Sequence, residues 1–384
     1  MIKNNIRRVL CLLVIFSCAF MSSCGGSQGK PAMTLTYGDN TTTFSSNIYS
    51  YYLSYMKTTL LLTEYSNIYR QMGMSLSEAD VAELPDNPDY WTSAHPYYEG
   101  VTYGDIAKFQ AEDTIKQILA IAAYCKEKNL RLSNEEIKNI DNSVKEIIKD
   151  FYGNSKSRFN AALLKYDINE AIFKEIKRYE SLTGVFNRYL FNADEGQKPI
   201  TDDMINMIYD ETCVRVKHIL IPFSPGTRDA DGNDIEYTEE ELAEKKAYAE
   251  DLYNRITGGE DFDSLLSESS DGMPFDGYTF SEDSGFAQEF ADAAFDMKIG
   301  DVRKVETVFG LHIIKKYELL PAEQTLDLNT GDTWRSSILK QIQAYFMAEE
   351  LQPYIEKIEV HKSETNLFDI LTSAVMFDSL ELIY

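Results

Sequence analysis

The 384-residue chain is poor in cysteine, proline, tryptophan and positive charge. It has 5 Cys, 10 Pro, 2 Trp and 4 His, and its 37 Lys and Arg stand against 62 Asp and Glu, a formal net charge of −25. So few cysteines and prolines exclude a disulfide-rich scaffold and a collagen-like chain. The deficit of cations argues against a nucleic-acid partner, because binding to phosphates needs clustered Lys and Arg.

What is present is an ordinary globular composition, with 44% hydrophobic and 26% charged residues. Such a chain buries enough apolar surface to fold, so intrinsic disorder is excluded as its main state. At roughly 150 residues per domain the length indicates two or three domains. One apolar run stands out, at residues 9–21, and it is shorter than the roughly 20 residues that span a bilayer.

The apolar run lies within an export signal. Three cations, Lys3, Arg7 and Arg8, precede it, and small residues follow it, which is typical of a secretory signal peptide. The sequence Met-Ser-Ser-Cys-Gly at 21–25 resembles a bacterial lipobox with Met where Leu is usual. We therefore predict a lipoprotein signal peptide over 1–23, lipidation of Cys24 and a tether over 24–34. The alternative is an ordinary signal peptide with incidental cysteines.

Cleavage at this site leaves two cysteines beside the lipidated one. Cys125 falls in a helical pattern and Cys213 stands just before a predicted strand. The sequence does not give their separation, and we expect two unpaired, mostly buried thiols.

Residues 35–211 have mainly helical periodicity and are predicted to form a helical domain. A short strand and turn at 35–41 begin it. Ser133 with Glu136 forms a capping-box signal, and Thr201 is a second N-cap signal. A segment rich in proline and small polar residues, 74–102, is predicted to be a loop. Helices are expected from near 45 through 62 and at about 103–128, 134–151, 156–164, 167–193 and 201–210.

The pattern changes to α+β over 212–318. Residues 214–221 alternate and are rich in β-branched side chains, which predicts a strand, and Thr238 caps a helix that ends at Gly258. The other elements expected here are short helices at 262–267 and 287–296 and strands at 277–280, 302–307 and 311–317.

The last segment, 319–384, contains a predicted helix at 333–357 and an apolar tail. Because that tail is too apolar to stay in water, we expect it to pack on the N-terminal helical domain. The predicted fold class is thus α+β, with a compact α+β module inserted in a mostly helical domain that both flanks build.

Four motifs follow one another along the module. They are Val-Lys-His-Ile-Leu at 216–220, Gly-Glu-Asp-Phe at 259–262, Phe286-x-x-x-Phe290-x-x-Ala-Ala-Phe followed by Ile-Gly-Asp-Val at 299–302, and Thr307-x-Phe-Gly-Leu-His-Ile-Ile ending at 314. In these motifs and in their order the module resembles the parvulin-type peptidyl-prolyl isomerases. The flanks resemble, more loosely, the helical chaperone part of exported PrsA/SurA-type foldases.

The resemblance implies which residues form the site. His218 and His312 match the paired histidines of neighbouring strands, Thr307 matches a hydroxyl that can bond such a histidine, and Asp271 is the nearest match to the family's loop Cys or Asp. The implied substrate contacts are Phe286, Phe290, Met273 and Phe309, with Phe286 and Phe290 on one helix face. The alternatives are that the histidines and phenylalanines are only core residues and that Asp271 is a solvated loop residue.

Two departures from the family pattern bear on activity. The usual Gly-Gly-Asp-Leu-Gly stretch is replaced by residues 275–280, and Phe286 stands where Met or Leu is usual. A bulkier pocket weakens turnover or leaves a module that only binds.

The expected function is therefore a prolyl isomerase and folding chaperone for exported proteins, lipid-anchored outside the cytoplasm through Cys24. Its partners are unfolded or partly folded exported chains with X-Pro bonds, not nucleic acid. The alternative is a catalytically silent holdase or binding lipoprotein with the parvulin fold. No cofactor or metal is implied, because isomerisation needs neither, and the acidic stretch 229–234 lacks the EF-hand spacing and is expected to be a turn.

Overall fold

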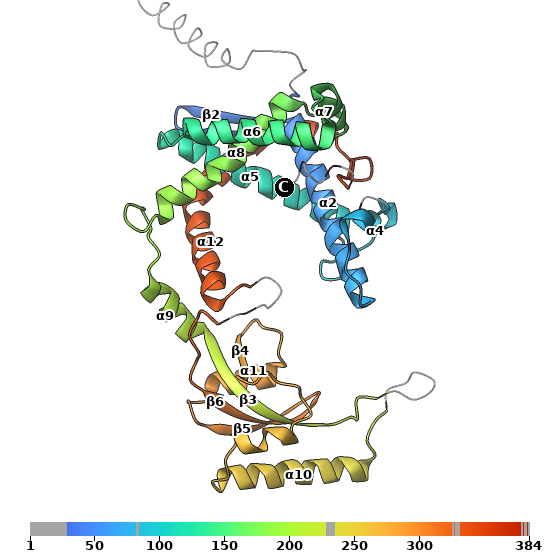
Figure 1. The fold of residues 1–384 in the computed structure, drawn as a ribbon, viewed down its shortest axis with the longest axis vertical. Coiled ribbons are helices and arrows are strands. Elements are labelled where there is room, and N and C mark those ends of the chain that lie inside the picture. Colours follow the sequence, from blue (N-terminus) through green and yellow to red (C-terminus); the bar gives the residue numbers. More distant parts are fainter. Residues whose placement is uncertain are drawn as a thin grey trace, which may run out of the picture. The chain divides into compact units, whose positions relative to one another are not determined.

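The computed structural model describes residues 29–81, 84–227, 235–324, 326, 331–377, 379 and 382. The signal peptide, Cys24 and the acidic stretch 229–234 lie outside these residues. The chain divides into two units, unit 1 from residues 1–197 and 347–384 and unit 2 from residues 198–346 (Figure 1). The predicted α+β class, with one module inserted between two flanks, is confirmed.

Unit 1 begins with a small sheet whose third strand comes from the far end of the chain. Strands β1 (Pro31–Tyr37) and β2 (Asn40–Ser45) are antiparallel neighbours, and β1 also pairs with β7 (Ile358–Val360), giving the order β2-β1-β7. His361 follows β7, and its Nε2 lies 3.0 Å from Thr34 Oγ1 on β1. The expected single short strand is therefore one of three.

Helices form the rest of unit 1. Two short ones, α3 (Glu78–Val81) and α4 (Pro88–Thr92), lie inside 74–102, so the prediction of a loop there is wrong in part. Pro88 opens α4, where its missing N–H costs no hydrogen bond. The others are α2 (Ser46–Gln71), α5 (Tyr103–Glu127), α6 (Asn134–Tyr152), α7 (Lys156–Leu163), the 3₁₀ turn η1 (Leu164–Tyr166), α8 (Glu170–Phe191) and α13 (Lys362–Thr365).

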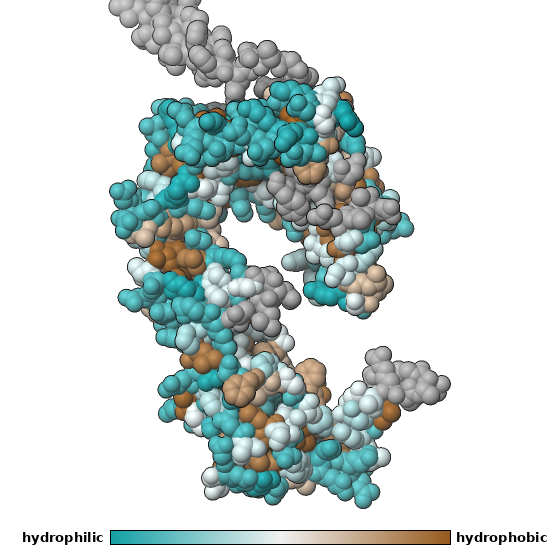
Figure 2. Space-filling view, in the orientation of Figure 1, coloured by the Kyte–Doolittle hydropathy of each residue, from teal (hydrophilic) through white to brown (hydrophobic). Residues whose placement is uncertain are grey.

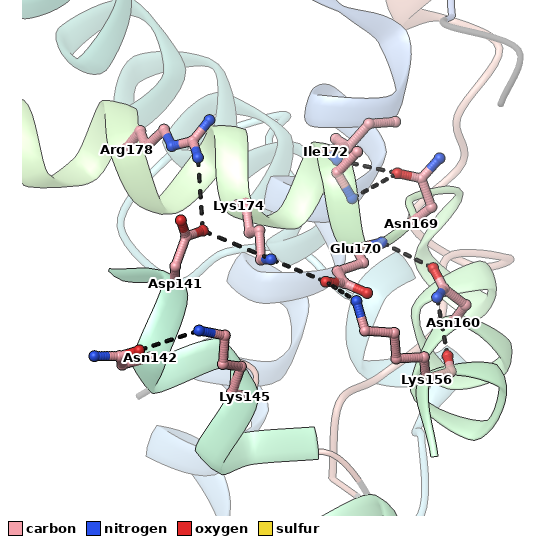
Figure 3. Close-up of polar contacts among 11 residues, drawn as sticks. Asp141, Asn142, Lys145, Lys156, Asn160, Asn169, Glu170, Ile172, Lys174 and Arg178 are labelled. Carbon is pink, nitrogen blue, oxygen red and sulfur yellow. Dashed lines mark hydrogen bonds and ion pairs between the residues drawn. The ribbon is translucent and has the colours of Figure 1, made fainter. Parts of the chain in front are cut away.

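Side-chain caps mark the starts of α5, α6, α7 and α8. The predicted capping box is present: Ser133 Oγ accepts from the Glu136 amide at 3.1 Å, and the Glu136 carboxylate accepts from the Ser133 amide at 2.7 Å. Between α6, α7 and α8, cations and carboxylates alternate (Figure 3). Lys174 Nζ lies 2.9 Å from Glu170 and 3.6 Å from Asp141, so it joins α8 to α6.

The C-terminal tail completes the core of unit 1. Ile370, Met376, Phe377 and Leu382 are all at most 6% exposed and belong to the same hydrophobic cluster as the N-terminal helices. The Tyr51 hydroxyl on α2 donates to the Leu382 carbonyl at 2.8 Å.

A buried charge also ties the tail to α2. The Lys57 side chain is fully buried, and its Nζ donates to Asp86 Oδ2 at 2.6 Å and to the Ser373 carbonyl at 2.8 Å. Trp91 Nε1 donates to the other Asp86 oxygen at 3.0 Å. The Asp86 carboxylate therefore accepts hydrogen bonds from a buried lysine and a buried indole.

Unit 2 is built on a four-stranded antiparallel sheet with the order β4-β3-β6-β5. Its two central strands, β3 and β6, supply side chains to both faces of the sheet. Alternate residues pack in a hydrophobic cluster with α11 on one face and in a cluster with α10 and η2 on the other. The strands are β3 (Cys213–Pro222), β4 (Tyr278–Ser281), β5 (Val302–Thr307) and β6 (Gly310–Tyr317), and the helices are α9 (Asp202–Thr212), α10 (Glu239–Thr257), η2 (Asp263–Glu268) and α11 (Gln288–Asp296).

Helix α12 (Trp334–Ile355) contributes residues to both units, since the boundary falls between 346 and 347. Its first part packs with α9 around Trp334, Ile338 and Ile342. Apolar residues gather at the surface of unit 2 over β3, β4 and α11 (Figure 2).

Cys125 and Cys213 are both free and buried, as predicted. Burial raises the pKa of the Cys125 thiol to about 11. Of the helices within the described residues, none combines the length and apolarity that a membrane span requires.

Candidate active site

The site lies where β3 and β6 run side by side. In their antiparallel register His218 stands opposite Ile314 and Leu220 opposite His312, so the two histidines are diagonal neighbours. Both point to the α11 face, as do Val214 and Val216. The strand alternation of the sequence thus delivers two imidazoles to one buried position, 4% and 6% exposed.

The two rings are nearly parallel and share a hydrogen bond. Their centroids are 5.1 Å apart at an interplanar angle of 11°, and His218 Nδ1 lies 2.9 Å from His312 Nδ1. At the other ends, His218 Nε2 lies 2.7 Å from Asp271 Oδ2 and His312 Nε2 lies 2.9 Å from Thr307 Oγ1. The predicted residues Asp271, His218, His312 and Thr307 form one continuous chain.

The loop before β4 places Asp271 by bonding to the end of β3. The Leu220 amide donates to Ser269 Oγ at 3.0 Å, the Ser270 amide donates to the Leu220 carbonyl at 3.0 Å, and the Asp271 amide donates to Ser269 Oγ at 3.2 Å. These bonds fix the loop beside the strand that carries His218. Asp271 remains 31% exposed, so its carboxylate is partly hydrated.

The β5–β6 turn places Thr307. Gly310 has φ +154°, and a Cβ there would lie 2.3 Å from the Ile221 carbonyl oxygen, so the turn requires glycine. The Phe309 amide donates to Thr307 Oγ1 at 3.1 Å, and the Phe223 amide donates to the Phe309 carbonyl at 3.1 Å. The turn is thereby joined to β3.

The hydrogen-bond chain assigns its own tautomers. An ionised Asp271 only accepts, so His218 donates from Nε2 and its bare Nδ1 accepts from His312 Nδ1–H. His312 Nε2 is then bare and accepts from the Thr307 hydroxyl. Every proton in the chain of hydrogen bonds points toward Asp271. If both histidines were protonated, their Nδ1–H groups would face each other across 2.9 Å.

Burial favours these neutral rings. Burial, together with the repulsion from a positive charge on His218, lowers the pKa of His312 to about 4, against the opposing pull of Asp271. Burial also lowers the pKa of His218, against the opposing pull of Asp271. Around neutral pH the pair is therefore uncharged.

An aromatic wall covers the histidine pair. Phe290, on α11, is 2% exposed, and its ring centroid lies 5.1 Å from both His218 and His312 in edge-on contact. Phe286 stacks on Phe290 at 5.4 Å and 18°. Helix α11 begins at Gln288, however, so the prediction that both phenylalanines share a helix face is wrong: Phe286 precedes the helix.

The other two predicted contact residues lie on adjoining loops. Phe309 is 62% exposed in the β5–β6 turn, beside Val308, which is 82% exposed. Met273 is half-buried, two residues beyond Asp271. Both remain predicted substrate contacts. Among the described residues, neither side chain takes part in the hydrogen bonds that link Asp271, His218, His312 and Thr307.

Sequence reasoning missed Tyr278 and Phe280. The Tyr278 hydroxyl donates to Asp271 Oδ2 at 2.9 Å, and burial, followed by the hydrogen bond to Asp271, raises the pKa of Tyr278 to about 12. Phe280 lies 4.4 Å from Phe286 and closes the wall from β4. Both stand in the stretch that departs from the family pattern, so no motif pointed to them; alternation along β4 was the available signal.

The pH dependence of the two imidazoles is a test of the neutral pair. We expect their ¹³C NMR shifts to titrate below the ordinary pKa of 6.5, with His312 near 4. Between these two pH values the unfolded chain then binds more protons than the folded one. The contribution of the histidine pair to the free energy of unfolding of unit 2 is therefore fully present above about pH 6.5 and is lost as the pH falls toward 4.

Spectra of His218→Asn and His312→Asn assign the two signals. A titration midpoint at or above 6.5 for His312 contradicts the neutral pair.

Part of this chain is similar to a known family of domains. The model of the PPIC-type PPIase domain family matches residues 204–318. A curated relative, foldase protein PrsA of Caldanaerobacter subterraneus subsp. tengcongensis, is 25% identical over 268 residues, which are 66% of this chain and 68% of the relative.

Two solved structures are among the matches. PrsA from Bacillus subtilis is 24% identical, with a TM-score of 0.23, over 67% of this chain and 88% of that one. PrsA from Bacillus cereus is 20% identical, with a TM-score of 0.28, over 71% and 85%.

Proposed function

We propose that the chain is a lipid-anchored foldase that acts on exported proteins, and that residues 204–318, which match the PPIC-type PPIase domain family, are its parvulin-type peptidyl-prolyl cis–trans isomerase domain. The observation that carries the proposal is the chain from Asp271 through His218 and His312 to Thr307 beneath Phe290. Foldases act on unfolded polypeptides, so the substrate class is an exported chain with slow X-Pro bonds.

The reaction needs shape and weak polarity more than reactive groups. The X-Pro bond has a rotational barrier of roughly 20 kcal/mol because of amide resonance. A pocket that binds the twisted amide better than either planar form lowers that barrier. In our proposal the Phe290 wall holds the proline ring away from water, and resonance is easier to break there because the carbonyl loses its hydration.

The histidine chain keeps that pocket in shape. Two neutral imidazoles joined by directed hydrogen bonds present no net charge to the apolar proline ring, yet they hold the β3–β6 floor rigid. Thr307 and Asp271 fix the two outer nitrogens. We propose these four as positioning residues and Phe290, Phe286, Met273 and Phe309 as substrate contacts.

One observation favours the second candidate, a catalytically silent holdase. Phe286 packs against Phe280 at 4.4 Å, Tyr278 at 5.4 Å and Phe290 at 5.4 Å, so a bulky ring occupies the edge of the wall. A narrowed pocket binds chains without turning them over. Refolding of a protein limited by X-Pro isomerisation separates the two: the foldase accelerates the slow phase, whereas the holdase only suppresses aggregation.

The anchor is tested by the lipidated residue. We expect radiolabelled palmitate to enter the parent protein in a bacterial host and the protein to sediment with membranes. The variant Cys24→Ser should lose the label and appear in the soluble or secreted fraction, because its thiol is gone. Label retained in Cys24→Ser contradicts the site.

A further inference from the structure

A basic segment lies at one end of unit 1 of this acidic protein. Residues 149–165 run from the end of α6 through α7 to η1 and hold four cations against one acid, Asp150, a net of +3 in a chain whose net charge is −25. All four cations are exposed. They are Lys149, Lys156, Arg158 and Lys165.

Two large apolar side chains are exposed in the same segment. Phe151 is 63% exposed and Leu164 is 70% exposed, whereas their neighbours Phe159 and Leu163 are fully buried and supply the core contacts. Folding therefore leaves Phe151 and Leu164 at the surface among cations. Aromatic and leucine side chains beside lysines are the residues that enter the headgroup region of a bilayer.

The carboxylates beside this segment are shared among several cations. Figure 3 shows Glu170 between two lysines, 3.1 Å from Lys156 and 2.9 Å from Lys174. Asp141 lies 3.6 Å from both Lys174 and Arg178. Three cations thus share two carboxylates, and the positive charge of the segment extends onto α8.

The tether enters unit 1 at this end. The Gly29 amide donates to Asn47 Oδ1, and Asn47 Nδ2 donates to the Asp167 carbonyl, two residues beyond Lys165. Ser50 Oγ near the start of α2 donates to Asp167 Oδ2 at 2.7 Å, and α2 packs against η1, the last element of the segment. Gly29 is the fifth residue after Cys24, which allows at most about 17 Å of extended chain between them. An anchored chain therefore holds this end of unit 1 at the headgroups.

We propose that the basic segment 149–165 binds the anionic surface of the bilayer, as a second membrane contact beside the lipid. The inference rests on the proposed anchor for its geometry and on charge and exposure for its chemistry. Cations near an anionic leaflet are attracted within a Debye length, and exposed Phe151 and Leu164 add apolar insertion. Because the rest of the acidic surface is repelled, the contact also orients unit 1.

The test uses the mature chain 25–384 without lipid, which keeps every described residue, and vesicles of phosphatidylglycerol or phosphatidylcholine. We expect sedimentation with the phosphatidylglycerol vesicles at low salt and release at 0.5 M salt. Neutralising the segment (K149Q/K156Q/R158Q/K165Q) should lower the partition coefficient at least about tenfold. The variant F151S/L164S should lower it severalfold and leave the salt dependence.

The matched control removes four cations from unit 2, namely K246Q/R255Q/K298Q/K340Q. Its change in net charge equals that of the segment variant, so it is a matched control. Because it leaves segment 149–165 intact, it should partition like the parent or differ by less than about twofold. Equal loss in both quadruple variants, or no preference of the parent for phosphatidylglycerol, overturns the proposal. Because no lipid is attached and isomerisation is assayed separately, that failure is distinct from failure of the Cys24 anchor or of the isomerase.

Discussion

Replacing Phe290 by leucine is expected to lower kcat/KM for X-Pro isomerisation about tenfold to a hundredfold. The ring makes edge-on contacts with both His218 and His312 and is 2% exposed. A tenfold to hundredfold loss corresponds to roughly 1.4–2.7 kcal/mol of transition-state stabilisation. We assign it to contacts of the ring with the twisted proline, because the contacts with the histidines are already present before the substrate binds. Leucine keeps most of the volume, so the stability cost should stay below about 1.5 kcal/mol.

The same change on the same helix provides the control. Phe295 lies at the other end of α11, 6.0 Å from Phe280, and the described ring contacts of the histidines do not include it. Phe295→Leu should keep kcat/KM within about threefold of the parent while costing similar stability. Equal activity of Phe290→Leu and the parent removes Phe290 from the proline pocket.

Replacing Asp86 by alanine is expected to destabilise unit 1 by about 3–5 kcal/mol, because it leaves the Lys57 ammonium buried without its carboxylate. The Lys57 side chain is fully buried, and Trp91 Nε1 loses its acceptor as well. Chemical denaturation followed by Trp91 fluorescence in a Trp334→Phe background measures unit 1 alone, since those are the two tryptophans.

Two further variants interpret that result. Asp150→Ala removes the carboxylate of an exposed pair with Lys149 and should cost about 0–1 kcal/mol. Lys57→Met combined with Asp86→Ala should recover much of the lost stability, because no unpaired charge is then buried. A loss of less than 1 kcal/mol in Asp86→Ala contradicts the buried-charge account.

Local signals in the sequence predicted most elements because each depends on neighbouring residues. Strand alternation placed β3 within one residue of its observed bounds, and the Ser133 and Thr238 caps mark the starts of α6 and α10. The helices α3 and α4 escaped because four or five residues are too few to show a 3.6-residue period.

Contacts between distant residues could not be predicted in the same way. β7 pairs with β1 across more than 300 residues, and His361 bonds Thr34 across that pairing. At the site, the motifs gave the residue types, but the order Asp271–His218–His312–Thr307 depends on a diagonal register and on a loop bonded to Leu220. The bond from Tyr278 to Asp271 depends on the position of the same loop.

The most direct test of the central claim is magnetisation-exchange NMR of a short X-Pro peptide with catalytic amounts of the chain 25–384 at neutral pH. The account predicts that the parent raises the cis–trans exchange rate and that the double variant His218→Asn/His312→Asn loses at least about tenfold of that acceleration. A well-folded parent that leaves the exchange rate at its uncatalysed value contradicts it, and the module is then a binding scaffold.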